Sequence, residues 1–200
     1  MSTEAIYNRR SIRRYRKENL SREIINQILD AARMAPSGKN RQPWKFLVLS
    51  GHEKEAFLAA MHRGIEREKN GRAFLPDSKY GLGDAENTLR IMREAPVTVA
   101  VLNTNGKNPF DSVTADERIA EIVDTLSIGA AIENMLLKAE EMGIGTLWIA
   151  NTCFAYEEMV EYLQTEHQLV GAVAMGYADE APGARPRKSL EEVVEYRGDM

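Results

Sequence analysis

The residues most suited to chemistry in this chain form a basic cluster close to its start. Positions 9–13 read Arg-Arg-Ser-Ile-Arg, so that three guanidinium groups and a hydroxyl fall within five residues. Guanidinium groups can each hold two phosphate oxygens through parallel hydrogen bonds, and a hydroxyl can both donate and accept. This combination of side chains is typical of a site for a phosphorylated ligand.

A polar loop and a second basic cluster could complete such a site. The loop follows a helix that Pro36 ends, and positions 37–42 read Ser-Gly-Lys-Asn-Arg-Gln. Short polar side chains and free backbone groups suit a ring with amide nitrogens and carbonyls. The second cluster, Arg-Pro-Arg-Lys at positions 185–188, lies on a Pro- and Gly-containing loop near the end of the chain.

Each stretch also has an ordinary structural interpretation. A run of charges is usually a solvated face, and a basic arm can also contact nucleic acid. Pro, Ser, Gly and Asn after a helix are typical of a plain turn. That interpretation does not explain the Gln-Pro-Trp of positions 42–44, which places a large ring where a strand begins. Arg14, Arg16 and Lys17 are expected on the surface.

Four motifs in one order make the chain resemble the nitroreductase family of FMN-dependent oxidoreductases. They are R-R-S-x-R near the start, A-P-S-x-x-N-x-Q-P-W before the first core strand, G-I-G-T-L-W late in the chain and R-P-R-K near the end. The resemblance covers nearly the whole chain. It implies an α+β fold, with a central, mostly antiparallel sheet flanked by helices, and a homodimer built on a long central helix.

The resemblance also implies the residues that bind FMN. The two basic clusters would converge on its phosphate and ribityl chain, and the polar loop would cross a dimer interface to reach the flavin of the other subunit. The candidate cofactor-binding residues are Arg9, Arg10, Ser11, Arg13, Pro36, Ser37, Gly38, Asn40, Gln42, Gly145, Thr146, Arg185 and Arg187. No residue is predicted to be catalytic and none to bind a metal. Trp44 is expected to pack in the core.

The strand that follows Gly145 departs from the family pattern. Many members have a Glu-Gly pair near the flavin after this strand, whereas positions 149–152 here read Ile-Ala-Asn-Thr. Which backbone amide serves flavin N5 is therefore left open. Gly143 has a simpler explanation as the residue that ends the long helix, while Gly145 could let backbone approach the flavin ring.

Composition limits the class of protein. The chain has 200 residues, 44% of them apolar and 28% charged, which is typical of one globular domain spanning 1–200. A net charge of −4 argues against a nucleic-acid binder. One cysteine, Cys153, and the lack of any signal-like or membrane-spanning apolar run predict a cytoplasmic protein without an internal disulfide. Cys153 is expected to be a buried structural thiol, and the three histidines show no metal-ligand spacing.

Periodicity predicts alternating helices and strands. Ser21 is a plausible N-cap, and Ser189 begins a capping box. Residues 70–84 have turn residues without periodicity and are expected to be an irregular lid. The predicted helices cover 4–8, 21–36, 52–68, 87–94, 115–142 and 156–164, and the predicted strands cover 44–49, 97–102, 146–150 and 169–175. The middle of the 115–142 helix, from Leu126 to Leu137, is apolar on most faces, which suggests burial by a second subunit.

These observations predict an FMN-dependent oxidoreductase. It would take reducing equivalents from NADH or NADPH and pass them to a nitroaromatic, a quinone or a similar flat acceptor by a ping-pong mechanism. No acid–base pair is apparent, which fits a reaction whose chemistry the flavin supplies. Two alternatives stay open: another flavin reaction on the same scaffold, such as reductive dehalogenation or dehydrogenation, or a non-enzymatic module with a nucleic-acid-binding arm.

Overall fold

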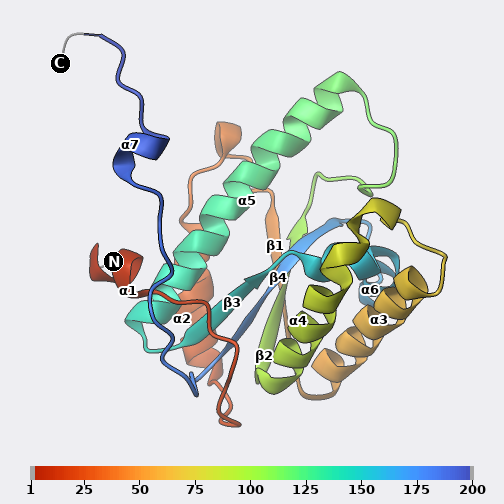
Figure 1. Ribbon diagram of the computed structural model, residues 1–200, viewed down its shortest axis with the longest axis horizontal. Helices are drawn as coiled ribbons and strands as arrows, with labels where there is room; N and C mark the ends of the chain where they lie inside the picture. Colours follow the sequence, from red (N-terminus) through yellow and green to blue (C-terminus); the bar gives the residue numbers. More distant parts are fainter. Residues whose placement is uncertain (1–2, 199–200) are drawn as a thin grey trace.

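The computed structural model describes residues 3–198 as an antiparallel sheet with helices on both faces (Figure 1). Within that range four strands form one sheet in the order β1-β2-β4-β3, and every neighbouring pair is antiparallel. The strands are β1 (Trp44–Ser50), β2 (Val97–Asn103), β3 (Gly145–Ile149) and β4 (Gln168–Gly176). The α-helices are α1 (Thr3–Asn8), α2 (Arg22–Arg33), α3 (Gly51–Lys69), α4 (Leu82–Glu94), α5 (Ala115–Glu141), α6 (Tyr156–Leu163) and α7 (Leu190–Val193). Three 3₁₀ turns lie between them, η1 (Gly38–Asn40), η2 (Pro76–Gly81) and η3 (Asn151–Ala155).

Side chains of the central strands contribute to two separate hydrophobic cores, one on each face of the sheet. Along β2, Val97, Val99 and Val101 pack with α2 and α5, whereas Ala100 and Leu102 pack with α3, α4 and α6. Successive residues of a strand point to opposite faces, so apolar residues at both odd and even positions let helices pack on each face. All seven residues of β2 are buried. Apolar side chains on both of its faces thus place this strand at the centre of a helix–sheet–helix sandwich.

Most predicted elements are confirmed within one or two residues of their bounds. The N-cap at Ser21 is confirmed, because its Oγ accepts a hydrogen bond from the backbone N–H of Ile24 at 3.3 Å. Gly143 has a φ of 71°, which is the left-handed conformation expected after a helix. The capping box at Ser189 is also confirmed, because its backbone N–H donates to the Glu192 carboxylate at 2.8 Å.

The predicted irregular segment 70–84 is wrong in part. It contains η2, and α4 begins at Leu82 rather than at the predicted residue 87. Leu82 is buried against the core, and the same is true of Ala85. A pattern of only two apolar residues, three positions apart, is too short to predict a helix. Their burial against the core nevertheless holds the first turn of α4 in place.

One face of the long helix α5 is buried by its own chain, so the apolar middle does not by itself require a second subunit. Ile128, Ile132 and Met135 are fully buried against α2 and the sheet. A different set of apolar residues on α5 is exposed: Ile119, Ile122 and Leu126, with 62%, 47% and 70% of their surface accessible. An exposed apolar strip therefore remains on a face of α5 that does not pack against the core.

Two further observations concern the described helices and side chains. None of the helices between residues 3 and 198 is long and apolar enough to cross a membrane. In the same part of the chain, no group of three or more His, Cys, Asp or Glu side chains is arranged to hold a metal ion.

The start of α5 gives a testable pH dependence. Lys107 and the capping residue Thr114 both donate hydrogen bonds to Glu117, and these contacts lower the pKa of its carboxyl from 4.5 to about 2. Because the folded-state pKa is depressed, ionised Glu117 stabilises the helix start above about pH 4.5, and this stabilisation is lost as pH falls from 4.5 toward 2. Titration of the Glu117 carboxyl by NMR should give a midpoint near the lower value. A midpoint at the value of an unfolded chain would contradict the capping box.

Candidate functional site

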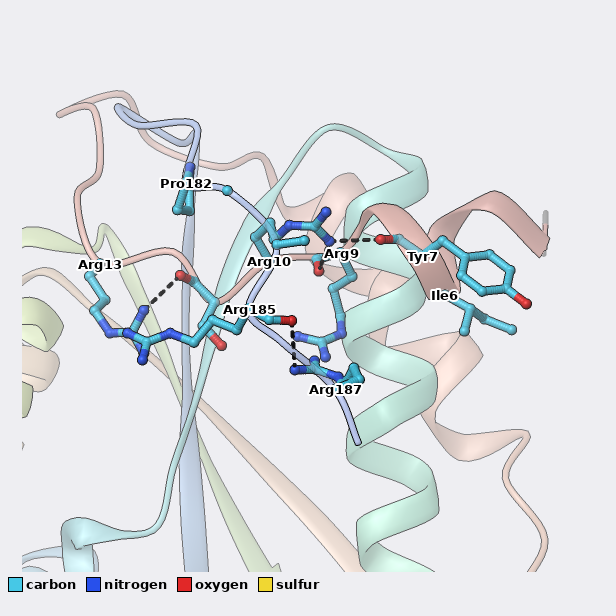
Figure 2. A pocket seen from close by; sticks show the side chains of 11 residues that line it. Ile6, Tyr7, Arg9, Arg10, Arg13, Pro182, Arg185 and Arg187 are labelled. Carbon is cyan, nitrogen blue, oxygen red and sulfur yellow. Dashed lines mark hydrogen bonds between the residues drawn. The ribbon is translucent and has the colours of Figure 1, made fainter. Parts of the chain in front are cut away.

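The structure brings the two basic clusters together around one cavity of about 430 Å³. Figure 2 shows arginines of the N-terminal segment and of the C-terminal segment around the same hollow. Five of its lining residues are arginines, and Ile6, Tyr7, Ser11 and residues 182–184 complete the wall. The lining arginines are Arg9, Arg10, Arg13, Arg185 and Arg187. All six of the cationic and hydroxyl residues predicted for phosphate and ribityl binding therefore meet.

This cavity is strongly positive. None of the residues that line it, all within the described range, carries a carboxylate. Arg10, Arg13 and Arg187 donate to nearby backbone carbonyls, as the dashed lines in Figure 2 show. Five guanidinium groups around one space repel each other unless an anion is present. The arrangement is therefore suited to a phosphorylated ligand.

Arg9 is only partly satisfied by the described residues. Its Nε is buried and has no hydrogen-bond partner there, although it lies 3.5 Å from the Glu133 carboxylate on α5. A buried donor without a partner costs about 1–3 kcal/mol, so such groups call for an explanation. A phosphate oxygen in the cavity would provide the missing acceptor for a guanidinium that already lines it.

The N-terminal segment is positioned by backbone pairing and by two buried side chains. Ile12 donates from its N–H to the Thr146 carbonyl at 2.9 Å, and Arg16 donates to the Tyr177 carbonyl at 2.9 Å. The side chains of Ile12 and Tyr15 are buried in the core, and burial raises the pKa of the Tyr15 phenol. Residues between these anchors, including Arg13, are thereby held at the open edge of β3.

Gly145 and Thr146 have structural roles in this chain. A Cβ on Gly145 would lie 2.9 Å from Ile12 Cγ1, so the glycine makes room for Ile12. The expectation that Gly145 also lets backbone approach a flavin ring stays a prediction. Thr146 is buried, and its carbonyl pairs with Ile12. Neither residue is in the wall of this cavity, although both contact the N-terminal segment that lines it.

A second cavity of about 280 Å³ adjoins the first through a shared residue, Arg13. Its walls come from α4, from β3 and from the start of η3. The polar residues on these walls, besides Arg13, are Asp84, Asn87, Thr88 and Asn151. The Asn151 side-chain amide donates to Thr88 Oγ1 at 3.3 Å. The shared arginine makes the two cavities neighbouring compartments, one strongly cationic and one rich in amides.

The edge of β3 adds backbone groups to the second cavity. The Thr146 carbonyl points away from β4 and accepts a hydrogen bond from Ile12. In an antiparallel edge strand the backbone groups of every second residue point away from the partner strand, so the N–H and C=O of Trp148 also point outward. Trp148 lines this cavity together with Leu147 and Ile149. The compartment thus combines apolar walls with donors and acceptors suited to a flat, amide-containing ring.

The polar loop lies apart from both cavities in the single chain. Pro36, Asn40 and Gln42 are exposed, whereas Ser37 and Gly38 are half-buried, and none of the five lines either cavity. Gly38 donates its backbone N–H to Ser127 Oγ on α5 at 3.3 Å, so the loop is seated on the long helix. Trp44, at the end of the loop, packs against the α2–α5 core as predicted.

Cys153 is exposed, which corrects the prediction of a buried thiol. It lies in η3, and partial desolvation of the thiol raises its pKa. A raised pKa leaves little reactive thiolate near neutral pH, so the residue is not suited to act as a nucleophile.

Sequence reasoning missed the polar residues of the second cavity. Asn87 and Thr88 were assigned only to a helix, and Asn151 was noted only as a departure from the family pattern. One signal pointed to Asn151, because it follows β3 where the family pattern differs. No spacing relates it to Asn87 and Thr88, which come from an element more than 60 positions earlier.

Comparison with known proteins agrees with this architecture. A family model, the Nitroreductase family, matches residues 6–177. A 4-nitrobenzoate reductase from Pseudomonas putida is 27% identical over 204 residues, covering 88% of this chain and 84% of the relative. An iodotyrosine deiodinase from Thermotoga neapolitana is 28% identical over 195 residues, covering 94% and 93%.

A solved structure leads to the same family. It is a protein from Desulfovibrio desulfuricans, described as a nitroreductase in complex with FMN. It superposes with a TM-score of 0.70 at 26% identity, over 98% of this chain and 95% of that one. Since the family model also spans most of its length, the chain belongs to the nitroreductase family.

Proposed function

We propose that this chain is an FMN-dependent oxidoreductase that passes reducing equivalents from NADH or NADPH to a nitroaromatic, a quinone or a similar flat acceptor. The observation that carries the proposal is the cavity walled by five arginines without a carboxylate. Such a cavity fits a phosphate group, and the relative from Desulfovibrio desulfuricans binds FMN. Residues 1–200 would act as one domain.

The chain's own residues would bind and orient the cofactor. Arg9, Arg10, Ser11, Arg185 and Arg187 would hold the phosphate and ribityl chain. When bound, FMN would supply the redox chemistry, which no side chain here provides. The protein contributes charge neutralisation, a defined ring position and exclusion of water.

The second cavity is suited to the polar edge of the flavin ring. Arg13 lies between the two cavities, so it can contact both the ribityl chain and the ring. Asn87, Thr88 and Asn151 provide side-chain donors and acceptors, and the outward N–H of Trp148 provides a backbone donor. This arrangement offers candidates for the ring amides in place of the absent Glu-Gly pair.

A homodimer would bring the polar loop to the cofactor. The loop is seated on α5 beside the exposed strip of Ile119, Ile122 and Leu126, and its own polar side chains face outward. An exposed apolar strip of this kind marks a contact surface. In a dimer formed through α5, Ser37, Gly38, Asn40 and Gln42 of one subunit would reach the flavin of the other.

Reductive dehalogenation is the second candidate reaction. The iodotyrosine deiodinase from Thermotoga neapolitana matches nearly the whole length of this chain, at an identity similar to that of the 4-nitrobenzoate reductase. The same cofactor site would serve both reactions, and the acceptor would differ. A halogenated phenol should therefore be tested beside nitroaromatics and quinones.

Removing one guanidinium from the cationic cavity should weaken FMN binding. A charge-assisted bond contributes roughly 1.5–3 kcal/mol, so Arg10→Ala or Arg187→Ala should raise the Kd for FMN about tenfold or more. Riboflavin, which lacks the phosphate, should bind weakly to the wild-type protein and respond little to either change. Fluorescence titration measures both affinities. Arg14→Ala is the matched control, because Arg14 is exposed and engages the fold through its backbone carbonyl. Wild-type affinity in both cavity variants would refute the assignment.

A charge on the exposed strip of α5 should separate the subunits. Leu126→Glu places a carboxylate where 70% of the leucine surface is accessible, so the folded monomer tolerates it but an apolar interface does not. Light scattering should show a dimer for the wild type and a monomer for the variant, with FMN lost at the same time. Tyr80→Glu, at another exposed position, should stay dimeric. A wild-type monomer that binds FMN stoichiometrically would contradict the proposal.

One compartment should serve electron donor and acceptor in turn. Oxidised nicotinamide must then leave before the acceptor binds, which gives parallel lines in double-reciprocal plots. Under anaerobic conditions, NADH or NADPH should bleach the flavin absorbance of the purified protein, and a nitroaromatic or quinone should restore it. Intersecting lines would exclude the ping-pong order. Reoxidation by a halogenated phenol alone would favour the dehalogenase reaction.

A further inference from the structure

The loop from Ser37 to Gln42 has an unusual backbone. Three of its residues, Lys39, Asn40 and Gln42, have φ angles of 54°, 55° and 48°, and none of them is a glycine. Residues with a Cβ rarely adopt this left-handed region because the Cβ crowds the carbonyl oxygen. Such a conformation persists only where surrounding contacts determine it. Since all three of these residues are exposed, the contacts that hold the loop must involve its other residues.

A buried carboxylate on α5 provides the main contact. Arg41 donates from Nε and Nη2 to Asp124 Oδ1, at 2.9 and 2.6 Å. The other oxygen of Asp124 accepts from the side-chain amide of Asn105 at 3.2 Å. Asp124 is only 2% exposed, so both of its oxygens are satisfied by protein rather than by solvent. Arg41 is therefore fixed between two left-handed neighbours, Asn40 and Gln42.

Two further contacts place the loop in one position. A Cβ on Gly38 would lie 2.5 Å from Val123 Cγ1, so the glycine lies directly on α5. Within the loop, Gln42 donates its N–H to Ser37 Oγ at 3.0 Å. The loop thus contacts a single turn of α5, and the Arg41–Asp124 ion pair is the charged bond in that contact.

We propose that Asp124 is a positioning residue that, through Arg41, holds Asn40 and Gln42 in the backbone conformation needed to reach the flavin of a second subunit. The inference rests on the proposed function, which assigns Asn40 and Gln42 to the flavin. Asp124 itself does not contact the cofactor. Without the ion pair, the left-handed residues would relax, and the loop would sample conformations that do not fit the partner's site.

Trypsin reports the state of the loop without any flavin signal, because Lys39 and Arg41 are cleavage sites within it. The test variants are Asp124→Asn, which keeps the shape but removes the charge, and Arg41→Lys, which keeps the charge but removes the two-pronged contact. Mass spectrometry of the purified full-length protein should show cleavage after Lys39 roughly tenfold faster in both. The Kd for FMN should rise by a similar factor, roughly tenfold, with an unchanged oligomeric state.

A rescue separates positioning from a general structural role. Lys39→Gly places a glycine where φ is 54°, a conformation that glycine adopts without strain. Added to Asp124→Asn, it should restore much of the lost FMN affinity. If Asp124 served only overall stability, the double variant would recover no affinity for FMN. Arg118→Gln is the control on the same helix, because it removes an exposed pair with Glu121 and should change neither cleavage nor affinity.

The outcomes distinguish this inference from the function on which it rests. Wild-type cleavage in both Asp124→Asn and Arg41→Lys would overturn the inference while FMN binding stands. Faster cleavage with unchanged FMN affinity would also overturn it, because the loop would then move without affecting the cofactor. A wild-type protein without affinity for FMN would refute the proposed function as well. Should Asp124→Asn fail to fold, Arg41→Lys and its glycine double variant decide the question.

Discussion

The cationic cavity depends on two side chains that are not cationic. Ile12 and Tyr15 are buried in the core on either side of Arg13, and they fix an arginine-rich segment against the end of β3. Burying each such side chain contributes about 1.5–3 kcal/mol, whereas two exposed charges 4 Å apart repel by about 1 kcal/mol in water. Each apolar anchor therefore outweighs the repulsion of one such pair, and the two anchors hold the N-terminal guanidinium groups in place before any ligand binds.

The same anchoring connects the two cavities. Because Arg13 lies between Ile12 and Tyr15, its backbone position is set by the core, and its side chain lines both compartments. Its backbone N–H donates to the Glu180 carboxylate at 2.5 Å, which ties the N-terminal segment to the loop that leads into the C-terminal cluster. In the proposed function, one residue whose own position is fixed by packing would thus contact both the ribityl chain and the ring.

The cluster residues could be predicted from sequence because the signal was local. Three arginines within five positions, and two more near the end of the chain, were sufficient to suggest a phosphate site, and the motif order supplied the family. The helix ends at Ser21 and Gly143 were predictable for the same reason, since capping depends on a few adjacent residues. The family assignment is confirmed by the family model, whereas the flavin contacts stay predictions.

Features that depend on distant pairs were beyond the sequence. Arg41 and Asp124 are 83 positions apart, and nothing in the neighbourhood of either residue identifies its partner. The contact between Gly145 and Ile12, more than 130 positions away, was equally beyond the sequence. The polar residues of the second cavity come from α4 and η3, and only the packing of these elements brings them together.

The apolar pattern of helix α5 combines several faces with different surroundings. Ile128, Ile132 and Met135 face the core, Asp124 and Ser127 carry the polar loop, and Ile122 and Leu126 remain exposed. Each set follows helical spacing, so two apolar stripes beside a narrow polar one make the helix look apolar on most faces. A helix buried on every side would have no room for the loop. The buried Asp124 separates the apolar stripe that packs on the core from the exposed apolar strip, and it seats the loop at that boundary.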